Sequence, residues 1–376
     1  MLNLERKIWI VIGTRPELIK QLPVYNECVK KIGKRNVCLI NSGQHKNFLN
    51  FYSKEHKVHF DLILNNLQST SSLKNNFKKS TKTFYNLISK YKPKIVIVQG
   101  DTTTAAACAY AASLVGVLVI HNEAGLRTYN NENPYPEELN RKLISSVSNF
   151  HLSPTILNKN NLIKEKIAKK NIFVVGNTGI DSFFSFIKKE QNNEAKNIIN
   201  YAKNNSKKIV FLTAHRREAK GERIDNWFKA IQFFFKKNKN FLLVCVRHPN
   251  KLAFNGIKKY LQKLDNFYLT NPLSYSTTSH IINNSSFVIT DSGGIQEECG
   301  TLGIPVVICR KFTERQEVIK LNIGKLTGFE VGNILKNLNW AKKKSMNKIK
   351  WNHKPYGNGN SRKKIAKIIK SVFNSL

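Results

Sequence analysis

The chain has 376 residues, with 62 Lys and Arg against 24 Asp and Glu, which gives a formal net charge of +38. Its length predicts two or three domains, and its 41% hydrophobic content excludes a wholly disordered chain. The longest small-and-apolar run, Ala105–Ile120, is shorter than the roughly 20 residues that span a bilayer. The apolar stretch Ile8–Ile12 is too short for a secretory signal, so we expect neither a leader nor a membrane partner.

Short runs of Val, Ile and Leu alternate with helical stretches in the first half of the chain. These runs lack the polar alternation of a half-exposed sheet, so they predict parallel strands that are buried on both faces. The predicted strands are Lys7–Ile12, Val37–Ile40, Lys94–Val98, Val117–Ile120, Phe150–Ser153 and Ile172–Val175. Strands that alternate with helices in this way indicate a doubly wound α/β domain.

A polar stretch, roughly Lys188 to Lys208, predicts a linker near residues 180–207, and a second series of buried strands follows. These strands are Ile209–Thr213, Phe241–Val246, Phe267–Leu269, Phe287–Thr290 and Val306–Ile308. Apolar residues at helical spacing then predict a helix over Lys363–Leu376. The sequence therefore predicts two α/β domains with ligand sites beyond the carboxyl ends of their strands.

Cysteine and lysine usage narrow the class of protein further. The six cysteines contain no CxxC pair, which argues against a disulfide framework or a zinc site and favours a reducing compartment. The chain has 50 lysines and 12 arginines, and the lysines are spread along it. We favour solvated lysine-rich helix faces over a nucleic-acid-binding surface, although a basic protein whose affinity falls steeply with salt is an alternative. Several arginines fall inside the motifs below, which suggests that those positions need a planar, bidentate side chain. They are Arg15, Arg127, Arg141, Arg216, Arg217 and Arg315.

Polar motifs follow the predicted strands of the first domain. Gly13-Thr14-Arg15-Pro16-Glu17 follows the first strand and opens a helix that carries Lys20, so Arg15 and Lys20 can bring positive charge to a binding site. The alternative is an ordinary strand–helix turn with solvated charges.

Three acidic residues form a candidate acid/base group. Asp101 and Glu123 each follow a strand, and Glu137 follows a Pro-Tyr-Pro segment. Clustered carboxylates can keep one of their number protonated. The structural alternatives are that Asp101 caps a helix and that Glu137 or Glu138 pairs with Arg141, for which Glu138 has the better spacing.

The second domain carries motifs that suit a diphosphate. Ala214-His215-Arg216-Arg217-Glu218 follows its first strand and is typical of a phosphate clamp. In the run Thr290–Glu298, Ser292-Gly293-Gly294 places backbone N–H groups at a helix N-terminus, which is an anion site, and Glu298 lies one turn on, where it could accept from ribose hydroxyls. Arg315, in Thr313-Glu314-Arg315, could add to the same phosphates or form a surface ion pair.

Together these motifs resemble the non-hydrolysing UDP-N-acetylglucosamine 2-epimerases. The matches keep the family's order and cover nearly the whole chain. They are Gly13–Glu17, Gly43-Gln44-His45, Gly100–Thr103, Glu123–Arg127, Pro136-Glu137-Glu138 with Asn140-Arg141, Gly176-Asn177-Thr178 with Asp181, His215–Glu218, Thr290–Glu298, Thr313–Arg315, and Pro355-Tyr356-Gly357 with Gly359 and Arg362.

The resemblance implies a GT-B-like fold, in which two Rossmann-like doubly wound domains face a central cleft. It implies an N-terminal domain of residues 1–182 with the C-terminal helix 358–376, which carries the acid/base residues, and a UDP-binding domain of residues 183–357. It also implies a cytoplasmic homodimer that uses neither a metal nor another cofactor and that interconverts UDP-GlcNAc and UDP-ManNAc for surface polysaccharide synthesis.

The resemblance also carries over site residues. The implied catalytic residues are Asp101, Glu123, Glu137 and His215, and the implied substrate-binding residues are Arg15, Lys20, Ser292, Gly293, Gly294, Glu298 and Arg315. The implied reaction eliminates UDP to give 2-acetamidoglucal and then adds UDP back. A GT-B glycosyltransferase or a hydrolysing epimerase, which share the fold and the phosphate site, are the alternative enzymes.

Overall fold

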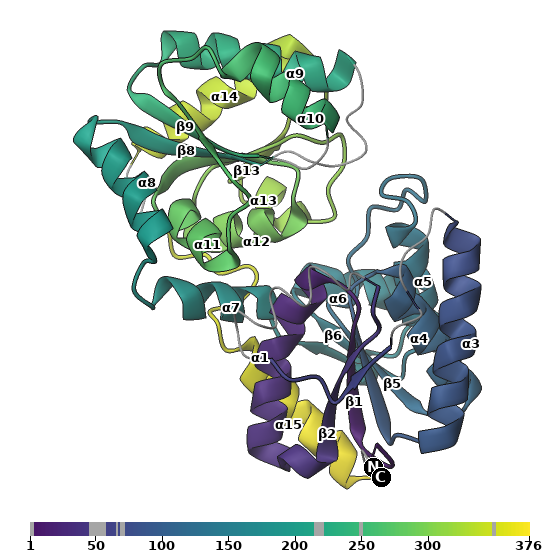
Figure 1. The fold of residues 1–376 in the computed structure, drawn as a ribbon. Helices are drawn as coiled ribbons and strands as arrows, with labels where there is room; N and C mark the ends of the chain where they lie inside the picture. The colour runs from purple at the N-terminus through teal and green to yellow at the C-terminus, as the bar shows by residue number, and fades with distance from the viewer. Residues whose placement is uncertain are drawn as a thin grey trace. The chain divides into compact units, whose positions relative to one another are not determined.

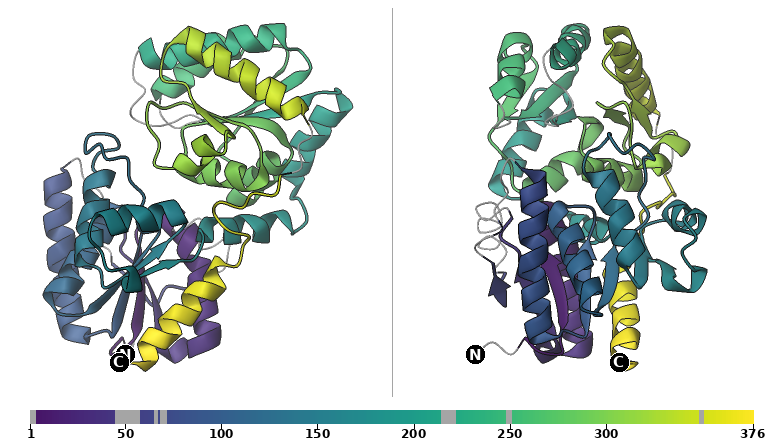
Figure 2. Two further views of the ribbon diagram at one scale, coloured as in Figure 1. Left: turned by 180° about the vertical axis from the view of Figure 1, so that it is seen from behind. Right: turned by 90° about the vertical axis from the view of Figure 1, so that its right-hand side faces the viewer.

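The computed structural model describes residues 4–44, 58–64, 67, 72–213, 222–247, 251–347 and 351–376. The chain divides into two compact units, which we call unit 1 (residues 1–182 and 357–376) and unit 2 (residues 183–356). Each unit has one parallel sheet with helices on both faces (Figures 1 and 2). The predicted class, α/β with two Rossmann-like doubly wound sheets, is therefore confirmed.

The sheet of unit 1 has seven strands in the order β3-β2-β1-β4-β5-β6-β7. All its neighbouring pairs are parallel, and the order of the strands reverses between β1 and β4. The strands are β1 (Ile8–Ile12), β2 (Val37–Asn41), β3 (Leu62–Ile63), β4 (Ile95–Gln99), β5 (Leu118–Asn122), β6 (Phe150–Ser153) and β7 (Ile172–Val174).

Helices α1 and α15 lie side by side on one face of this sheet, and α3, α4 and α5 cover the other (Figures 1 and 2). The helices of this part of the chain are α1 (Arg15–Ile32), α3 (Leu73–Tyr91), α4 (Thr103–Leu114), α5 (Glu137–Val147), α6 (Ile156–Lys164), α7 (Thr178–Ile187) and α15 (Ser361–Asn374). Short 3-10 turns occupy Lys34–Asn36 and Lys169–Asn171.

The small-and-apolar run seen in the sequence is explained by the position of α4. This helix packs between α3 and α5, and its alanines are buried because only small side chains fit so close an approach. Gly116 (φ +77°) then turns the chain into β5. Among the described residues, no helix is both long and apolar enough to cross a membrane.

The sheet of unit 2 repeats the same plan with six parallel strands in the order β10-β9-β8-β11-β12-β13, reversed between β8 and β11. The strands are β8 (Lys208–Thr213), β9 (Phe241–Val246), β10 (Phe267–Thr270), β11 (Ser285–Thr290), β12 (Val306–Ile308) and β13 (Gly324–Leu326). The helices are α8 (Asn193–Asn204), α9 (Glu222–Lys237), α10 (Lys251–Gly256), the π-helix Ile257–Leu261, α11 (Tyr275–Asn283), α12 (Gly293–Leu302), α13 (Gln316–Lys320) and α14 (Val331–Met346). Figure 1 shows α9, α10 and α14 on one face, with α11 and α12 on the other.

The linker expected near residues 180–207 is helical instead. Helix α7 runs across the boundary between the units, and α8 belongs to unit 2. The polar sequence of α8 hides an apolar stripe, because Ala195, Ile198, Ile199 and Ala202 recur at helical spacing and are buried.

Helix α15 returns the chain to unit 1, where one buried carboxylate holds its start. Asp181 accepts hydrogen bonds from the backbone N–H groups of Ser361 (3.1 Å) and Arg362 (3.0 Å), which are among the N–H groups that a helix start leaves unpaired. Ile365 and Ile369 bury the inner face of the helix.

We expect Asp181→Ala to lower the free energy of unfolding by about 1–2 kcal/mol, because it removes a helix cap. Urea unfolding measures this loss, and hydrogen exchange should place it in the amides of α15. Asp265→Ala is the control, since Asp265 is exposed in its ion pair with Lys239 and should change the free energy by less than about 0.5 kcal/mol. Equal losses in the two variants would contradict the capping role.

Candidate active site

The predicted motifs flank the two points at which the strand order reverses. Open parallel sheets bind ligands at such points, outside the carboxyl ends of the strands. In unit 1, Gly13 follows β1 and Asp101 lies two residues beyond the end of β4. In unit 2, Asp291 follows β11, and the motif that contains His215 follows β8.

A buried carboxylate, Glu17, ties the two strand ends of unit 1 together. Its Oε2 accepts from the backbone N–H groups of Gly13 (2.8 Å) and Thr14 (2.7 Å), and its Oε1 accepts from the Thr102 hydroxyl (2.7 Å). Burial raises the pKa of Glu17, while these hydrogen bonds act in the opposite direction. Thr14 also caps α1, so the first residue of that helix, Arg15, and the turn after β4 share one anchor.

Glu123 is fixed in an unusual backbone conformation beside this anchor. Its φ of +65° lies in the left-handed region that non-glycine residues seldom adopt, and such outliers cluster at functional sites. Lys20 forms a close ion pair with its carboxylate, while Gln99 (2.6 Å) and Asn177 (3.0 Å) donate to it. Lys20 thus meets one of the predicted acid/base residues directly.

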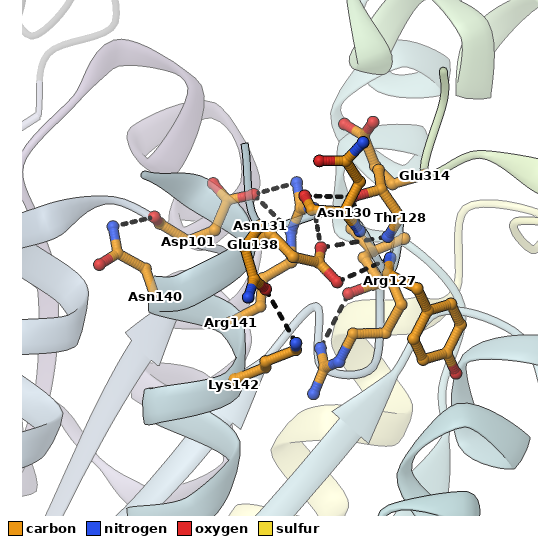
Figure 3. A network of polar contacts seen from close by, with 12 residues as sticks. Asp101, Arg127, Thr128, Asn130, Asn131, Glu138, Asn140, Arg141, Lys142 and Glu314 are labelled. Carbon is orange, nitrogen blue, oxygen red and sulfur yellow. Dashed lines mark hydrogen bonds and ion pairs between the residues drawn. The ribbon is translucent and has the colours of Figure 1, made fainter. Parts of the chain in front are cut away.

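Asp101 is held by an arginine and does not cap a helix. Thr102 is the N-cap of α4, since its hydroxyl accepts from the backbone N–H of Ala105 (3.1 Å), so the capping alternative for Asp101 is wrong. Arg141 instead donates to Asp101 Oδ2 from Nη2 (2.6 Å) and Nε (2.9 Å), as Figure 3 shows.

The predicted pairing of Glu138 with Arg141 is confirmed, with 2.9 Å between Oε2 and Nη1. Glu138 is fully buried, and it also accepts from the backbone N–H groups of Thr128 (3.1 Å) and Tyr129 (3.0 Å). Its neighbour Glu137 is the first residue of α5. Arg141 therefore links the segment that carries Glu137 to Asp101.

In unit 2, the glycine turn lies directly against Arg315. Helix α12 begins at Gly293, with Ser292 as its N-cap. A Cβ at Gly293 would lie 2.8 Å from Arg315 Cζ, so the turn needs glycine there to let the guanidinium approach. A helix N-terminus and a guanidinium that meet in this way form an anion-binding arrangement.

The surface alternative for Arg315 is wrong, because this side chain is buried. Its Nε donates to Glu297 (2.8 Å), and its Nη1 forms a close ion pair with Glu314, which also binds Arg310 (3.0 Å). Glu298 is buried as well, and it accepts from the Tyr275 hydroxyl (2.6 Å).

Some predicted residues lie outside the described residues, namely His45 and the segment 214–218 with His215, Arg216 and Arg217. Sequence reasoning missed the roles of several polar residues that hold the site, namely Glu17, Gln99, Asn177 and Tyr275, and it missed the contact of Arg141 with Asp101. Glu17, Arg141 and Asn177 lie inside the quoted motifs, so their presence in a motif could have identified them. Gln99 and Tyr275 lie outside the motifs.

Known proteins share the sequence pattern and the fold of this chain. Residues 29–370 match the family described as UDP-N-acetylglucosamine 2-epimerase. The chain belongs to this family. A relative from Campylobacter jejuni, named UDP-N-acetylglucosamine 2-epimerase, is 37% identical over 378 residues and 97% of each chain. The resemblance drawn from the motifs is therefore confirmed.

Solved structures of family members share the fold. The UDP-GlcNAc 2-epimerase from Neisseria meningitidis bound to UDP-GlcNAc gives a TM-score of 0.88 at 34% identity, covering 97% of this chain and 100% of that one. The Methanocaldococcus jannaschii enzyme in complex with UDP-GlcNAc and UDP gives 0.83 at 30% identity, covering 97% and 99%. This member of the epimerase family is accordingly GT-B-like.

Two buried histidines support the strand ends of unit 1. His121 on β5 pairs in register with His151 on β6, and its Nε2 donates to the Gly100 carbonyl (2.8 Å). Burial lowers the pKa of His121 to about 3 and that of His151 to about 4. Both rings are therefore neutral in the folded epimerase-family chain at neutral pH.

We expect acid to destabilise the protein between pH 6.5 and 4. An unfolded histidine binds a proton near pH 6.5, whereas these two folded histidines do not, so stability falls by up to about 1.4 kcal/mol per pH unit for each. Urea unfolding from pH 7 to pH 5 measures this slope. His121→Asn with His151→Asn should make it shallower, and an unchanged slope would contradict the assignment.

Proposed function

We propose that this protein interconverts UDP-GlcNAc and UDP-ManNAc as a non-hydrolysing 2-epimerase. The observation that carries the proposal is the placement of Asp101 and Glu123 just beyond the ends of the neighbouring strands β4 and β5, each with its own cation, in a fold whose solved relatives hold UDP-GlcNAc. A side chain that is held in place and can move a proton is what the reaction at the sugar C2 requires.

The reaction is an elimination followed by an addition. A base removes the C2 proton while the C1–O bond to the diphosphate breaks, which gives 2-acetamidoglucal and UDP. A proton then adds to C2 from the opposite face, and UDP re-forms the C1–O bond. We assign the proton transfers to Asp101, Glu123 and Glu137 as a group, with Lys20 supporting the charge of Glu123. The fourth proposed catalytic residue, His215, stabilises the departing diphosphate.

The remaining proposed residues bind the nucleotide. The N-terminus of α12 at Ser292-Gly293-Gly294, together with Arg315 and Arg15, stabilises the negative charge that develops on the departing diphosphate. Glu298 accepts from the ribose hydroxyls, and its contact with Tyr275 sets the orientation of its carboxylate. Donors fixed in advance cost no reorganisation when the C1–O bond breaks.

We also propose a cytoplasmic homodimer that serves surface polysaccharide synthesis. All six cysteines are free and buried, which suits a reducing compartment. On unit 1, α4 exposes Tyr110 and Leu114 beside α3, and Phe77 of α3 contacts Tyr110. This apolar face is our candidate for the contact with a second copy of the chain.

The central experiment is one incubation of UDP-GlcNAc with the protein in D₂O, followed by NMR. We expect both UDP-sugars, with deuterium at C2, because the proton at that carbon exchanges with solvent during the elimination. Release of free N-acetylmannosamine would indicate a hydrolysing epimerase instead. Epimer formed without deuterium would exclude the proton-transfer mechanism.

Gly293→Ala tests the nucleotide site. Its Cβ would collide with the Arg315 guanidinium, so we expect the dissociation constant for UDP to rise about tenfold or more, which is about 1.4 kcal/mol. Isothermal titration measures the change. Gly332→Ala in α14 is the control, because a Cβ there meets no described atom within 4 Å and should leave UDP binding unchanged. A folded Gly293→Ala variant with unaltered affinity would remove Arg315 from the site.

A further inference from the structure

We propose that Arg141 is a positioning residue that acts through Asp101. The inference rests on the proposed function, in which Asp101 belongs to the proton-transfer group. Arg141 would hold the Asp101 carboxylate in one orientation and couple it to the start of α5, where Glu137 lies. It would do so from inside the protein, without contacting the substrate.

Arg141 is buried more deeply than its partner Asp101. The Arg141 side chain is 3% exposed, whereas that of Asp101 is 26% exposed. The two N–H groups that converge on Oδ2 restrict rotation of the carboxylate, and a buried guanidinium contributes more to such a contact than a solvated one. Asp101 therefore faces solvent on one side and a rigid donor on the other.

Hydrogen bonds hold the backbone around Asp101, so rotation of its side chain is the main movement that remains possible. Asn140 donates to the Asp101 carbonyl (2.8 Å), and His121 donates to the carbonyl of Gly100. Gly100 itself adopts φ +68° and donates to the Asn122 carbonyl (3.0 Å). Because the backbone of the turn is held on both sides of Asp101, only the Asp101 carboxylate can still rotate, and Arg141 restrains that rotation.

Glu138 explains why the arginine is held so firmly. This fully buried carboxylate binds Arg141 and the backbone N–H groups of Thr128 and Tyr129, so one guanidinium joins the turn after β4, the loop after β5 and the first turns of α5 (Figure 3). Loss of the guanidinium would release Asp101 and leave Glu138 buried without its cation.

Arg127 offers a matched comparison in the same unit. Its side chain is also buried, and it donates from two nitrogens to Glu165, at 2.7 Å each, and to Ser145 (3.0 Å). Among the contacts of the described residues, its partners include none of the proposed acid/base residues. Arg127 and Arg141 are thus both buried, and each donates from two nitrogens to one carboxylate. They differ in that Arg141 binds Asp101, whereas Arg127 binds Glu165.

The test is a double-mutant cycle in kcat with Arg141→Lys and Asp101→Asn. Lysine keeps the charge but loses the planar fork, so we expect kcat to fall about 10- to 100-fold while the dissociation constant for UDP stays within about threefold. If Arg141 acts through Asp101, adding Arg141→Lys to Asp101→Asn should lower kcat by no more than about twofold further. Arg127→Lys should lower the melting temperature to a similar degree and leave kcat within about threefold.

Other outcomes would overturn the proposal. These are additive losses in the double variant, an unaltered kcat in Arg141→Lys, or an equal loss of kcat in Arg127→Lys. If Arg141→Lys does not fold, Glu138→Gln replaces it, with the expectation that kcat falls in this variant and that the loss vanishes in the Asp101→Asn background. An inactive wild-type protein would contradict the proposed function itself, whereas an active wild type with additive losses would contradict the role of Arg141 alone.

Discussion

A carboxyl group buried inside a protein needs hydrogen-bond donors around it, and this requirement organises the interior of both units. Glu17 is surrounded by N–H and O–H donors, Glu138 by a guanidinium and two backbone N–H groups, and Glu297 accepts from Arg315. In each case at least one donor comes from a loop or helix other than the one that carries the carboxylate. The polar core thereby fixes the loops beyond the strands, which hydrophobic packing alone would leave poorly defined.

The same requirement explains why this basic chain buries arginines rather than lysines. Among the described residues no lysine is buried, whereas four arginines are: Arg127, Arg141, Arg310 and Arg315. Arginine presents several N–H groups in a plane and can satisfy two acceptors at once, so it suits the interior, while the hydrated ammonium of lysine suits the surface. Solvated lysines and motif-bound arginines are what the composition predicts.

Buried parallel strands were predictable because continuous Val, Ile and Leu runs have few other uses in a chain of this kind. The strands that were missed, β3 and β13, have two and three residues, and β13 begins Gly-Lys, so no apolar run marks them. The motifs that flank the strand ends were also predictable. Their partners were not, because the contact of Asp101 with Arg141 joins residues 40 positions apart and depends on how α5 packs.

The path of the chain has a consequence for how the protein is made. Unit 2 is continuous in sequence, but unit 1 is interrupted by it and receives α15 afterwards. A ribosome therefore finishes every element of unit 2 before it delivers the helix that covers the apolar side of α1. Until then Asp181 has no N–H groups of α15 to accept from, and unit 1 stays incomplete until unit 2 has been synthesised.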